Sequence, residues 1–419
     1  MFVVYEVLLV LVFLITLPFF LLAGVLRGKY LVNFRERMGF YRDQAGVHDL
    51  WIHAVSVGET LAARTIVAEI LAVRPGTSFV FTTTTLTGQT QARRLFPHAS
   101  VTYFPFDFSW SVRRFLDHHK PRVFATMETE IWPNVTRLTR ARGIRLLLAN
   151  GRLSDRSFPR YRAFRAVVGP ILRRYDRILA REEVDHQRFL AIGAPESLVE
   201  TSGNVKFDFA PDDHPLEIAS RLEALIAGRP TIVLGSTMEG EDEELLPELE
   251  RFVRERGVFA IVAPRKPERF DVVAGLLSGS ALSSIRRRDL SEMTAPTPLD
   301  VLLLDSFGEL ARIYRYATLA FIGGSLVPTG GHNPIEAAAT GVPVCFGPHM
   351  SNFREIATAF LRDGGATEVR HGREVFELAG RLLDDPDSRG LMGGRARQTV
   401  EQNRGASART ARRIVELLS

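Results

Sequence analysis

The sequence predicts an α/β protein with two domains, each built on a mostly parallel sheet with helices on its faces. Short apolar segments rich in β-branched residues alternate with longer segments of helical periodicity, a pattern typical of parallel sheets. The alternation is interrupted once, over the polar, proline-containing segment 206–228. Because 419 residues exceed what one hydrophobic core usually supports, we interpret this interruption as the boundary between two domains.

The first half carries five predicted strands. The opening strand is followed by a glycine and then by a helix, whose apolar positions Ala63, Val67, Ile70 and Leu71 fall on one face. The strands that follow are also separated by helical segments, which predicts that they run parallel. The five predicted strands cover 51–57, 78–85, 122–129, 144–151 and 177–181.

The second half repeats this pattern and ends in a helical segment rich in arginine. Its predicted strands cover 231–237, 258–265, 301–305, 319–325 and 342–348. The predicted organisation is an N-terminal segment 1–26, a first domain 27–205, a linker 206–228, a second domain 229–389 and a helical segment 390–419.

Composition excludes several classes of protein. Hydrophobic residues make up 46% and charged residues 24% of the chain, as in ordinary globular proteins. The net charge of +5 suits contact with phosphates or anionic lipids, without the dense basic runs of a dedicated nucleic-acid binder. The single cysteine, Cys345, excludes an intramolecular disulfide and a cysteine-rich zinc site, and it indicates a reducing compartment. We expect no metal, because the acidic triplet 385–387 is predicted to form a turn.

Segment 2–26 is apolar except for Glu6, and it is long enough to cross a hydrocarbon core of ~30 Å. No basic residue precedes it. Five basic residues follow it, which places its C-terminal side in the cytoplasm. We therefore predict a single membrane anchor with cytoplasmic domains. These five residues are Arg27, Lys29, Arg35, Arg37 and Arg42.

Three other interpretations of this segment stay open. It can be a cleaved signal, although it lacks the usual basic start, or a buried core helix. It can also lie partly in the membrane without spanning it, since Glu6 and Pro18 weaken a clean span. The stretch 137–188, with 14 arginines against five acids, is either a solvated helical face or a surface attracted to anionic lipid, which we favour over contact with RNA.

Two acidic clusters follow predicted strands of the first half, where parallel sheets bind ligands. Glu59 opens a helix, whose dipole favours its ionised form, and it can be a functional group or only a first-turn carboxylate. Glu128 and Glu130 share a face if their strand extends that far. Paired acids on a buried strand end raise a pKa or require a cation, although a structural role in binding backbone N–H groups is equally open.

Three segments of the second half predict a nucleotide site. A predicted strand ends in Gly323-Gly324-Ser325, and after a further glycine pair Asn333-Pro334 starts a predicted helix with Glu336 in its first turn. Bare N–H groups at a helix start bind anions, and Glu336 can accept from ribose hydroxyls. Arg265 follows a strand and can bind a phosphate. The segment 308–310 opens another helix and either reads a base edge or only caps that helix.

Eight motifs, in order along almost the whole chain, resemble the 3-deoxy-D-manno-octulosonic acid (Kdo) transferases of lipid A biosynthesis. The resemblance implies the GT-B glycosyltransferase fold, with two Rossmann-like domains facing a cleft and an N-terminal membrane anchor helix. It also implies transfer of Kdo from CMP-Kdo to the lipid A precursor at the cytoplasmic face of the inner membrane. The motifs are FRERMG (34–39), HAVSVGET (53–60), METEIWPN (127–134), NGRLSDRS (150–157), GNVKFD (203–208), GSTMEGEDE (235–243), APRKPERF (263–270) and GGSLVPTGGHNPIEAA (323–338).

The resemblance also implies roles for single residues. Glu59 corresponds to a proposed general base, and Glu128 and Lys206 to groups that assist the transition state. The first domain would bind the acceptor and the second would bind CMP-Kdo, which is a substrate, so no cofactor is expected. The residues expected to hold the donor, including Gly324 and Ser325 of the glycine-rich loop, are Pro264, Arg265, Gly308, Glu309, Leu310, Gly324, Ser325, Asn333, Pro334, Ile335 and Glu336.

The chemistry of these residues fits an inverting transfer. CMP is a stabilised leaving group, so the reaction needs a base for the incoming hydroxyl more than it needs a strong acid. Two alternatives stay open: another membrane-associated GT-B transferase that uses a UDP-sugar, and a non-catalytic nucleotide-binding membrane protein. Retention of Glu59 and of the nucleotide cluster argues against the non-catalytic alternative.

Overall fold

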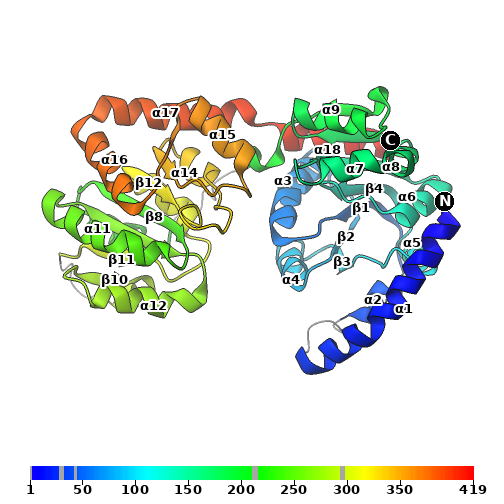
Figure 1. Cartoon of the computed structure of the whole chain (residues 1–419), viewed down its shortest axis with the longest axis horizontal. Coiled ribbons are helices and arrows are strands. Elements are labelled where there is room, and N and C mark those ends of the chain that lie inside the picture. The colour runs from blue at the N-terminus through cyan, green and yellow to red at the C-terminus, as the bar shows by residue number, and fades with distance from the viewer. Residues whose placement is uncertain (1, 28–32, 42–44, 210–215, 293–297) are drawn as a thin grey trace. The chain divides into compact units, whose positions relative to one another are not determined.

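The computed structural model describes residues 2–27, 33–41, 45–209, 216–292 and 298–419 (Figure 1). The chain divides into two compact units. Unit 1 comprises Met1–Asp208 together with Arg404–Ser419, and unit 2 comprises Phe209–Asn403. Lys29 and Arg42 of the predicted cytoplasmic flank, and 210–215 of the predicted linker, lie outside the described residues.

Unit 1 contains a seven-stranded parallel sheet in the order β3-β2-β1-β4-β5-β6-β7. The order reverses between β1 and β4, which is the topological switch point of a doubly wound sheet. The strands are β1 His48–His53, β2 Phe79–Thr83, β3 Ser100–Tyr103, β4 Pro121–Met127, β5 Arg145–Gly151, β6 Arg177–Ala180 and β7 Val199–Thr201.

Helices connect these strands and cover both faces of the sheet. One face packs against α3, α4 and α18, and the other against α5, α6, α8 and α9. The helices of unit 1 are α1 Phe2–Arg27, α2 Phe34–Arg37, α3 Val57–Val73, α4 Leu86–Leu95, α5 Ser109–His119, α6 Pro133–Ala141, α7 Phe158–Ala163, α8 Arg165–Leu172, α9 Glu183–Ala191, η1 Glu196–Leu198, η2 Val205–Asp208 and α18 Ala406–Leu418.

Unit 2 contains a second seven-stranded parallel sheet, in the order β10-β11-β9-β8-β12-β13-β14. Its order reverses between β8 and β12. The strands are β8 Thr231–Thr237, β9 Phe259–Pro264, β10 Ser284–Arg286, β11 Val301–Leu303, β12 Leu319–Ile322, β13 Val344–Phe346 and β14 Ala366–Glu368.

The helices of unit 2 include two that follow the switch strands, α11 after β8 and the short α14 after β12. One face of the sheet packs against α11, α12 and α16. The helices are α10 Ala219–Ile226, α11 Glu241–Arg256, α12 Pro267–Ser278, η3 Arg287–Glu292, α13 Leu310–Ile313, η4 Tyr314–Tyr316, α14 Ile335–Ala338, α15 Arg354–Arg362, α16 Gly372–Asp384 and α17 Pro386–Asn403.

The strands form where they do because both of their faces are buried. In β1, Leu50 and Ile52 join the core on one face of the sheet, while Trp51 between them is buried in the core on the other face. This period of two produces continuous apolar runs rather than polar alternation. The two Rossmann-like sheets confirm the predicted fold class.

The structure adds detail that the sequence patterns did not reveal. Four strands were not predicted, because they lie at the edges of the two sheets and lack the continuous apolar run of the buried strands: β3, β7, β10 and β14. The segment predicted as a linker contains η2 and α10. The predicted helical segment 390–419 falls in both units, since α17 packs with unit 2 whereas α18 returns to unit 1.

Candidate active site

Glu59 lies in the first turn of α3, after the carboxyl end of β1. Ser56 is the N-cap of this helix; its Oγ accepts from the Glu59 N–H (3.4 Å) and donates to Glu59 Oε1 (3.0 Å). The Val55 N–H donates to Glu59 Oε2 (2.8 Å). The carboxylate therefore helps to cap the helix, and these bonds fix its orientation at the edge of the sheet.

Burial raises the pKa of Glu59 to about 7. The negative charges of Glu128 and Glu130 contribute to this rise, whereas the hydrogen bonds from Val55 and Ser56 oppose it. A carboxyl group with this pKa is partly ionised at neutral pH and can accept a proton there. Shifted carboxyl groups of this kind gather at active sites, which makes Glu59 the candidate base.

The expectation that Glu128 and Glu130 share one face of a strand does not hold. Strand β4 ends at Met127, and Glu128 has a left-handed backbone (φ 57°), so the alternation of side chains stops before Glu130. Glu128 forms an ion pair with the buried Arg181, whereas Glu130 Oε2 accepts from Trp132 Nε1 (2.9 Å). Burial and then the charge of Glu128 raise the pKa of Glu130.

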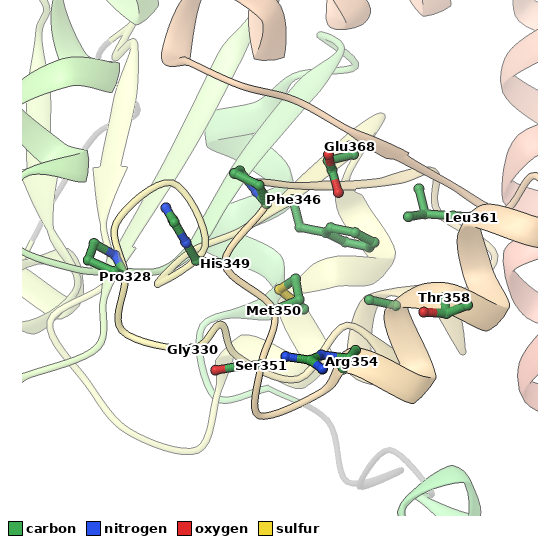
Figure 2. Close-up of a pocket in the computed structure, with 12 residues that line it drawn as sticks. Pro328, Gly330, Phe346, His349, Met350, Ser351, Arg354, Thr358, Leu361 and Glu368 are labelled. Atoms are coloured by element: carbon green, nitrogen blue, oxygen red, sulfur yellow. The ribbon is translucent and has the colours of Figure 1, made fainter. Parts of the chain in front are cut away.

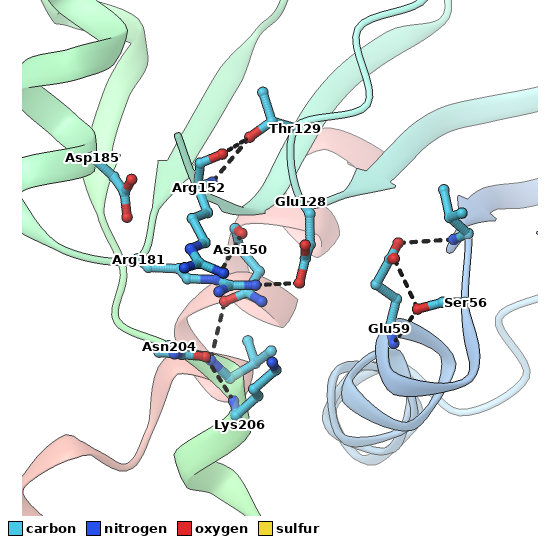
Figure 3. A network of polar contacts seen from close by, with 12 residues as sticks. Ser56, Glu59, Glu128, Thr129, Asn150, Arg152, Arg181, Asp185, Asn204 and Lys206 are labelled. Atoms are coloured by element: carbon cyan, nitrogen blue, oxygen red, sulfur yellow. Dashed lines mark hydrogen bonds and ion pairs between the residues drawn. The ribbon is translucent and has the colours of Figure 1, made fainter. Parts of the chain in front are cut away.

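Lys206 lies in η2, and its backbone N–H donates to Asn204 Oδ1 (3.1 Å). The Asn150 carbonyl, near the end of β5, accepts from Arg181 Nε (3.2 Å). Figure 3 shows Lys206 and this network on one side of the site, with Glu59 on the other. The structure thus brings the three residues predicted for catalysis to the carboxyl edge of the unit 1 sheet.

Glu128 and Asn150 have backbone conformations that are uncommon outside glycine. Both φ angles are positive, 57° and 55°, and both residues lie at the carboxyl ends of neighbouring strands next to the switch point. Such conformations cost on the order of 1–3 kcal/mol each and cluster at functional sites. These two conformations mark this edge of the sheet as a candidate functional site.

In unit 2, Pro264 ends β9 and Arg265 follows it with an exposed side chain. The Arg265 N–H donates to the Thr237 carbonyl (2.9 Å), which holds the backbone in place. Burial, together with the positive charge of Arg265, lowers the pKa of His332 to about 4. Arg265 also opposes the rise in the pKa of Glu336 caused by burial, so His332 and Glu336 both lie within electrostatic reach of Arg265.

Asn333 organises the loop before α14. Its Oδ1 accepts from the Ile335 N–H (3.1 Å), and its Nδ2 donates to Glu336 Oε1 (3.2 Å). Pro334 is the N-cap of α14, which has only four residues, so the predicted helix start is present as a single turn. The His332 Nε2 atom is buried and has no hydrogen-bond partner among the described residues.

The backbone N–H groups of Gly324 and Ser325 are already occupied. Both donate to the buried carboxylate of Glu241 (2.6 and 2.8 Å), and the Leu326 N–H joins them (2.9 Å). Bare N–H groups at this point of the loop would bind an anion, and the protein supplies that anion itself. These two N–H groups are therefore not available to a phosphate of the donor.

The segment Gly308–Leu310 precedes and opens α13, with a left-handed backbone at Gly308 (φ 84°). The Glu309 carboxylate accepts from Arg287 Nε (2.9 and 3.1 Å) and Nη2 (3.0 Å), and from the Ser306 hydroxyl. Because this ion pair occupies the side chain, a ligand here would contact the backbone of the segment.

A cavity of about 320 Å³ lies at the same edge of unit 2, between the loops that follow β12 and β13 (Figure 2). Its wall includes the buried side chains Phe346 and Met350 and the polar side chains Ser351, Arg354 and Glu368. The cavity therefore offers an apolar surface beside a cation, a carboxylate and a hydroxyl.

The loop after β13 is fastened to the glycine-rich loop. The Asn352 N–H donates to the Gly330 carbonyl (2.9 Å), and the His349 N–H donates to the Ser325 carbonyl (2.9 Å). The cavity and the predicted nucleotide residues thus belong to one group of connected loops. Among the described residues, no three His, Cys, Asp or Glu side chains are grouped as a metal site would require.

Sequence reasoning assigned no individual role to four residues of these sites, although each carried a signal. Arg181 closes a predicted strand at the ligand-binding edge, and Asn150 and His332 lie inside motifs already noted. Glu241 is a first-turn carboxylate after a strand, the same pattern that singled out Glu59. The partners of Arg181, Asn150 and Glu241 are distant in the sequence, so the signal did not show what these residues bind.

Comparisons with known proteins agree on one family. The family model for 3-deoxy-D-manno-octulosonic-acid transferase (kdotransferase) matches residues 32–209. A 3-deoxy-D-manno-octulosonic acid transferase of Haemophilus influenzae is 34% identical over 403 residues, 95% of this chain and 93% of that protein. One of Bordetella pertussis is 35% identical over 371 residues, 86% of this chain and 85% of that protein.

Solved structures with distant sequences share the fold. A glycosyltransferase from Rickettsia africae has a TM-score of 0.57 at 12% identity, covering 90% of this chain and 100% of its own. UDP-GlcNAc 2-epimerase from Neisseria meningitidis, bound to UDP-GlcNAc, also has a TM-score of 0.57, at 13% identity, covering 89% of this chain and 99% of its own. At such identity the likeness concerns the fold alone. With the identities and coverage of the two transferases, this chain belongs to the Kdo transferase family and is a glycosyltransferase.

Proposed function

We propose that this chain transfers Kdo from CMP-Kdo to the lipid A precursor lipid IVA in lipopolysaccharide biosynthesis, by an inverting displacement with Glu59 as the general base. Family membership supports the donor sugar. Glu59 supports the catalytic part most directly, because burial and a neighbouring carboxylate raise its pKa to about 7 at the ligand-binding edge of unit 1.

The proposed step balances without a covalent intermediate. The Glu59 carboxylate takes the proton of an acceptor hydroxyl, whose oxygen forms a bond to the anomeric carbon of Kdo. The bond from that carbon to the CMP phosphate breaks, and CMP leaves with the electron pair. The second negative charge that develops on its phosphate needs stabilisation by positive groups, more than it needs protonation.

Glu128 and Lys206 are proposed to assist this step from the same edge of unit 1. The ion pair with Arg181 holds Glu128 in place, and the charge of Glu128 keeps the pKa of Glu59 high enough for it to act as a base at neutral pH. The Lys206 ammonium would offset the negative charge that gathers around the acceptor.

We assign the CMP part of the donor to unit 2. Arg265 is proposed to bind the phosphate, Glu336 the ribose hydroxyls, and the backbone of Gly308–Leu310 the base. His332 is neutral at pH 7 and its buried Nε2 atom has no partner among the described residues, so it can bind a polar group of the donor. Gly324 and Ser325 would shape the loop through Glu241 and would not hold the phosphate themselves.

The cavity next to these loops is proposed to hold the sugar of the donor. Kdo carries a carboxylate and several hydroxyls, which Arg354, Ser351 and Glu368 of the cavity wall can bind. The loop contacts through Asn352 and His349 connect the cavity wall to the glycine-rich loop that precedes Asn333 and Glu336, which supports this assignment.

The acceptor is a lipid, and two features support contact with the inner membrane. Helix α1 contains an apolar stretch, Phe2–Phe19, long enough to cross a bilayer, and none of its residues is fully buried in the protein. The arginine-rich stretch 137–188 is partly engaged inside unit 1, for example through the ion pairs of Arg140 and Arg145 with Asp176. The remaining arginines would attract anionic lipid.

The decisive experiment presents purified enzyme and detergent-dispersed lipid IVA with CMP-Kdo or with UDP-sugars, and identifies the lipid product by mass spectrometry. We expect Kdo addition from CMP-Kdo alone. Glu59→Gln keeps a hydrogen-bond acceptor for the Val55 N–H, and we expect it to lower kcat by at least ~10²-fold while the affinity for CMP stays the same. Product from a UDP-sugar alone would establish the other transferase, and no product from any donor would favour the binding protein.

A further inference from the structure

Helix α1 has two different faces along its first 19 residues. One face is half-buried against unit 1 and includes Tyr5, Glu6 and Phe13. The opposite face is exposed, and its large side chains are all apolar, with exposed fractions from 50% to 77%. These are Val3, Val4, Val7, Leu8, Leu11, Val12, Leu14, Ile15 and Phe19.

Polar contacts fasten the first turns of α1 to unit 1. Glu6 Oε1 accepts from the Ser109 N–H (2.9 Å), and Glu6 Oε2 accepts from the Ser109 hydroxyl (2.8 Å) and from Asn134 Nδ2 (2.5 Å). Ser109 begins α5, whose N-cap Phe108 makes no side-chain cap, so Glu6 supplies the missing cap from another helix.

A neighbouring contact reinforces this attachment. The Tyr5 hydroxyl donates to Asp107 Oδ2 (2.8 Å), and Asp107 also accepts from the Asn134 N–H (3.1 Å) and the Val135 N–H (2.7 Å) at the start of α6. Glu6, the single acid of the apolar segment and an argument against a span, therefore has a structural role. It binds helix ends in the folded domain.

Aromatic contacts extend the attachment along the helix. The Phe13 ring lies 5.1 Å from the Phe108 ring and 6.2 Å from the rings of Phe34 and Phe106. At the other end, the guanidinium of Arg137 lies 5.2 Å from the centre of the Phe2 ring, and Arg174 lies at the same distance. Contacts with unit 1 thus run from Phe2 to Phe13.

The length of α1 beyond these contacts is too short for a span. From Leu14 to Arg27 about 14 residues remain, which at ~1.5 Å per residue reach about 21 Å, against the ~30 Å of a hydrocarbon core. A spanning α1 would have to give up the contacts of Glu6 and Tyr5, and would leave Asp107 and the start of α5 without these partners.

We propose that α1 does not cross the membrane but lies in its interface, with the face of Tyr5, Glu6 and Phe13 docked on unit 1 and its exposed apolar face in the lipid of the cytoplasmic leaflet. A helix with one apolar face and one anchored face suits this position. Exposed aromatic groups near the docking contacts extend the surface: Trp110 stacks 4.4 Å from Phe108, and Phe40 lies under Arg114. Arg137 and Arg174 add positive charge for anionic headgroups.

This inference rests on the proposed function for its lipid acceptor, because a docked α1 would hold unit 1 at the surface from which that lipid is taken. It also gives α1 a second role as part of the folded domain. A spanning anchor would act only as a tether.

Membrane topology tests the inference on the full-length chain. A protease site placed before Met1 is exposed to added protease in inverted inner-membrane vesicles or in spheroplasts, and Kdo transfer is assayed in the same samples. A docked helix keeps both ends on the cytoplasmic side, so we expect cleavage in inverted vesicles and protection in spheroplasts. Cleavage in spheroplasts alone would overturn docking. Transfer of Kdo in such samples would leave the proposed function intact.

Substitutions on the exposed apolar face of α1 test the contact with lipid. Val7→Asp combined with Ile15→Asp should lower binding to anionic liposomes at least tenfold, since two charges would enter the apolar interface. The matched control Leu391→Asp changes an equally apolar, exposed residue of unit 2 and should leave binding unchanged. Unchanged binding of the double variant, or an equal loss in the control, would contradict the proposal. Glu6→Ala should lower the thermal stability of the enzyme in detergent, and a spanning Glu6 would give no such loss.

Discussion

At the scale of single residues, the charge of Glu59 depends on its neighbours. Burial and the Glu128 carboxylate raise its pKa, whereas the hydrogen bonds from Val55 and Ser56 lower it, and the first two effects win. Glu128 is itself held by Arg181. The pKa of this helix-capping carboxyl group therefore lies near neutral pH, where a general base works best.

The pH dependence of the reaction should report this balance. Because Glu59 must be ionised to accept a proton, kcat/KM should fall as the pH drops below about 7. Glu128→Gln removes a negative charge and releases Arg181, and both changes favour ionised Glu59, so the acidic limb should move to lower pH by up to ~1 unit. The control Glu377→Gln, an exposed partner of Arg373, should leave the limb in place. If the acidic limb of the pH profile stays near pH 7 in Glu128→Gln, Glu128 does not influence the ionisation of Glu59.

Arg265 should set the affinity for the donor nucleotide. Arg265→Ala removes a charged hydrogen-bond donor, so we expect a loss of ~1.5–3 kcal/mol in CMP binding, or about tenfold to a hundredfold in Kd, by calorimetric titration. Glu336→Ala should cost less if it binds only ribose hydroxyls. Arg251→Ala, a surface arginine of the same unit paired with Glu248, serves as the control. If Arg265→Ala and Glu336→Ala both bind CMP as the wild type does, unit 2 does not bind the nucleotide as proposed.

At the scale of elements, the proposed donor site consists of short loops that hydrogen bonds hold to one another. Glu241, at the start of α11, accepts hydrogen bonds from three backbone N–H groups of the loop after β12, so these groups are occupied. The loop after β13 is fastened to it and forms the cavity wall with α15. A donor would therefore meet side chains here rather than an open phosphate loop.

The two ends of α15 offer a test of the sugar site. Arg354 at its start lines the cavity, whereas Arg362 at its end is exposed and pairs with Asp363. Arg354→Ala should raise KM for CMP-Kdo about tenfold, through the loss of a contact with the donor carboxylate, and should leave the Kd of CMP unchanged. Arg362→Ala should change neither value. Equal losses of CMP and CMP-Kdo binding in Arg354→Ala would instead assign Arg354 to the nucleotide.

At the scale of the whole molecule, the chain leaves unit 1 after η2 and returns to it at its end. The Asp208 carboxylate accepts from the Gly405 and Ser407 N–H groups at the start of α18. Ile414 and Leu418 of α18 then join the core formed by α3 and the sheet. The last helix therefore completes the unit that carries Glu59.

Core substitutions near the C-terminus should affect the stability of one unit at a time. Ile414 is 1% exposed in α18, so Ile414→Ala should destabilise unit 1 by ~2–5 kcal/mol. Val400 is fully buried in α17, and Val400→Ala should destabilise unit 2 instead. In urea unfolding followed with and without CMP, the transition that CMP stabilises should shift only in Val400→Ala. The assignment of α18 to unit 1 would fail if Ile414→Ala moved that same transition.

The sequence by itself determined the fold class, and it selected the candidate residues for the proposed chemistry. Apolar strands alternating with helices require parallel sheets, because each strand must be buried on both faces and each crossover must return along the sheet. Strand ends then identify Glu59, Glu128, Arg265 and Glu336, since ligands bind at the carboxyl edge. These signals are local, so they can be read along the chain without knowing any partner.

Only the tertiary structure decided what those residues contact. Glu241 occupies the N–H groups of Gly324 and Ser325, which are 83 and 84 positions away, and Glu6 caps a helix 103 positions away. The local sequence pattern shows a glycine-rich loop and an apolar helix whether or not these distant contacts form. Contacts between distant segments depend on how the strands and helices pack in three dimensions. The occupied N–H groups of the glycine-rich loop, the pKa of Glu59 and the contacts of α1 therefore follow from tertiary packing.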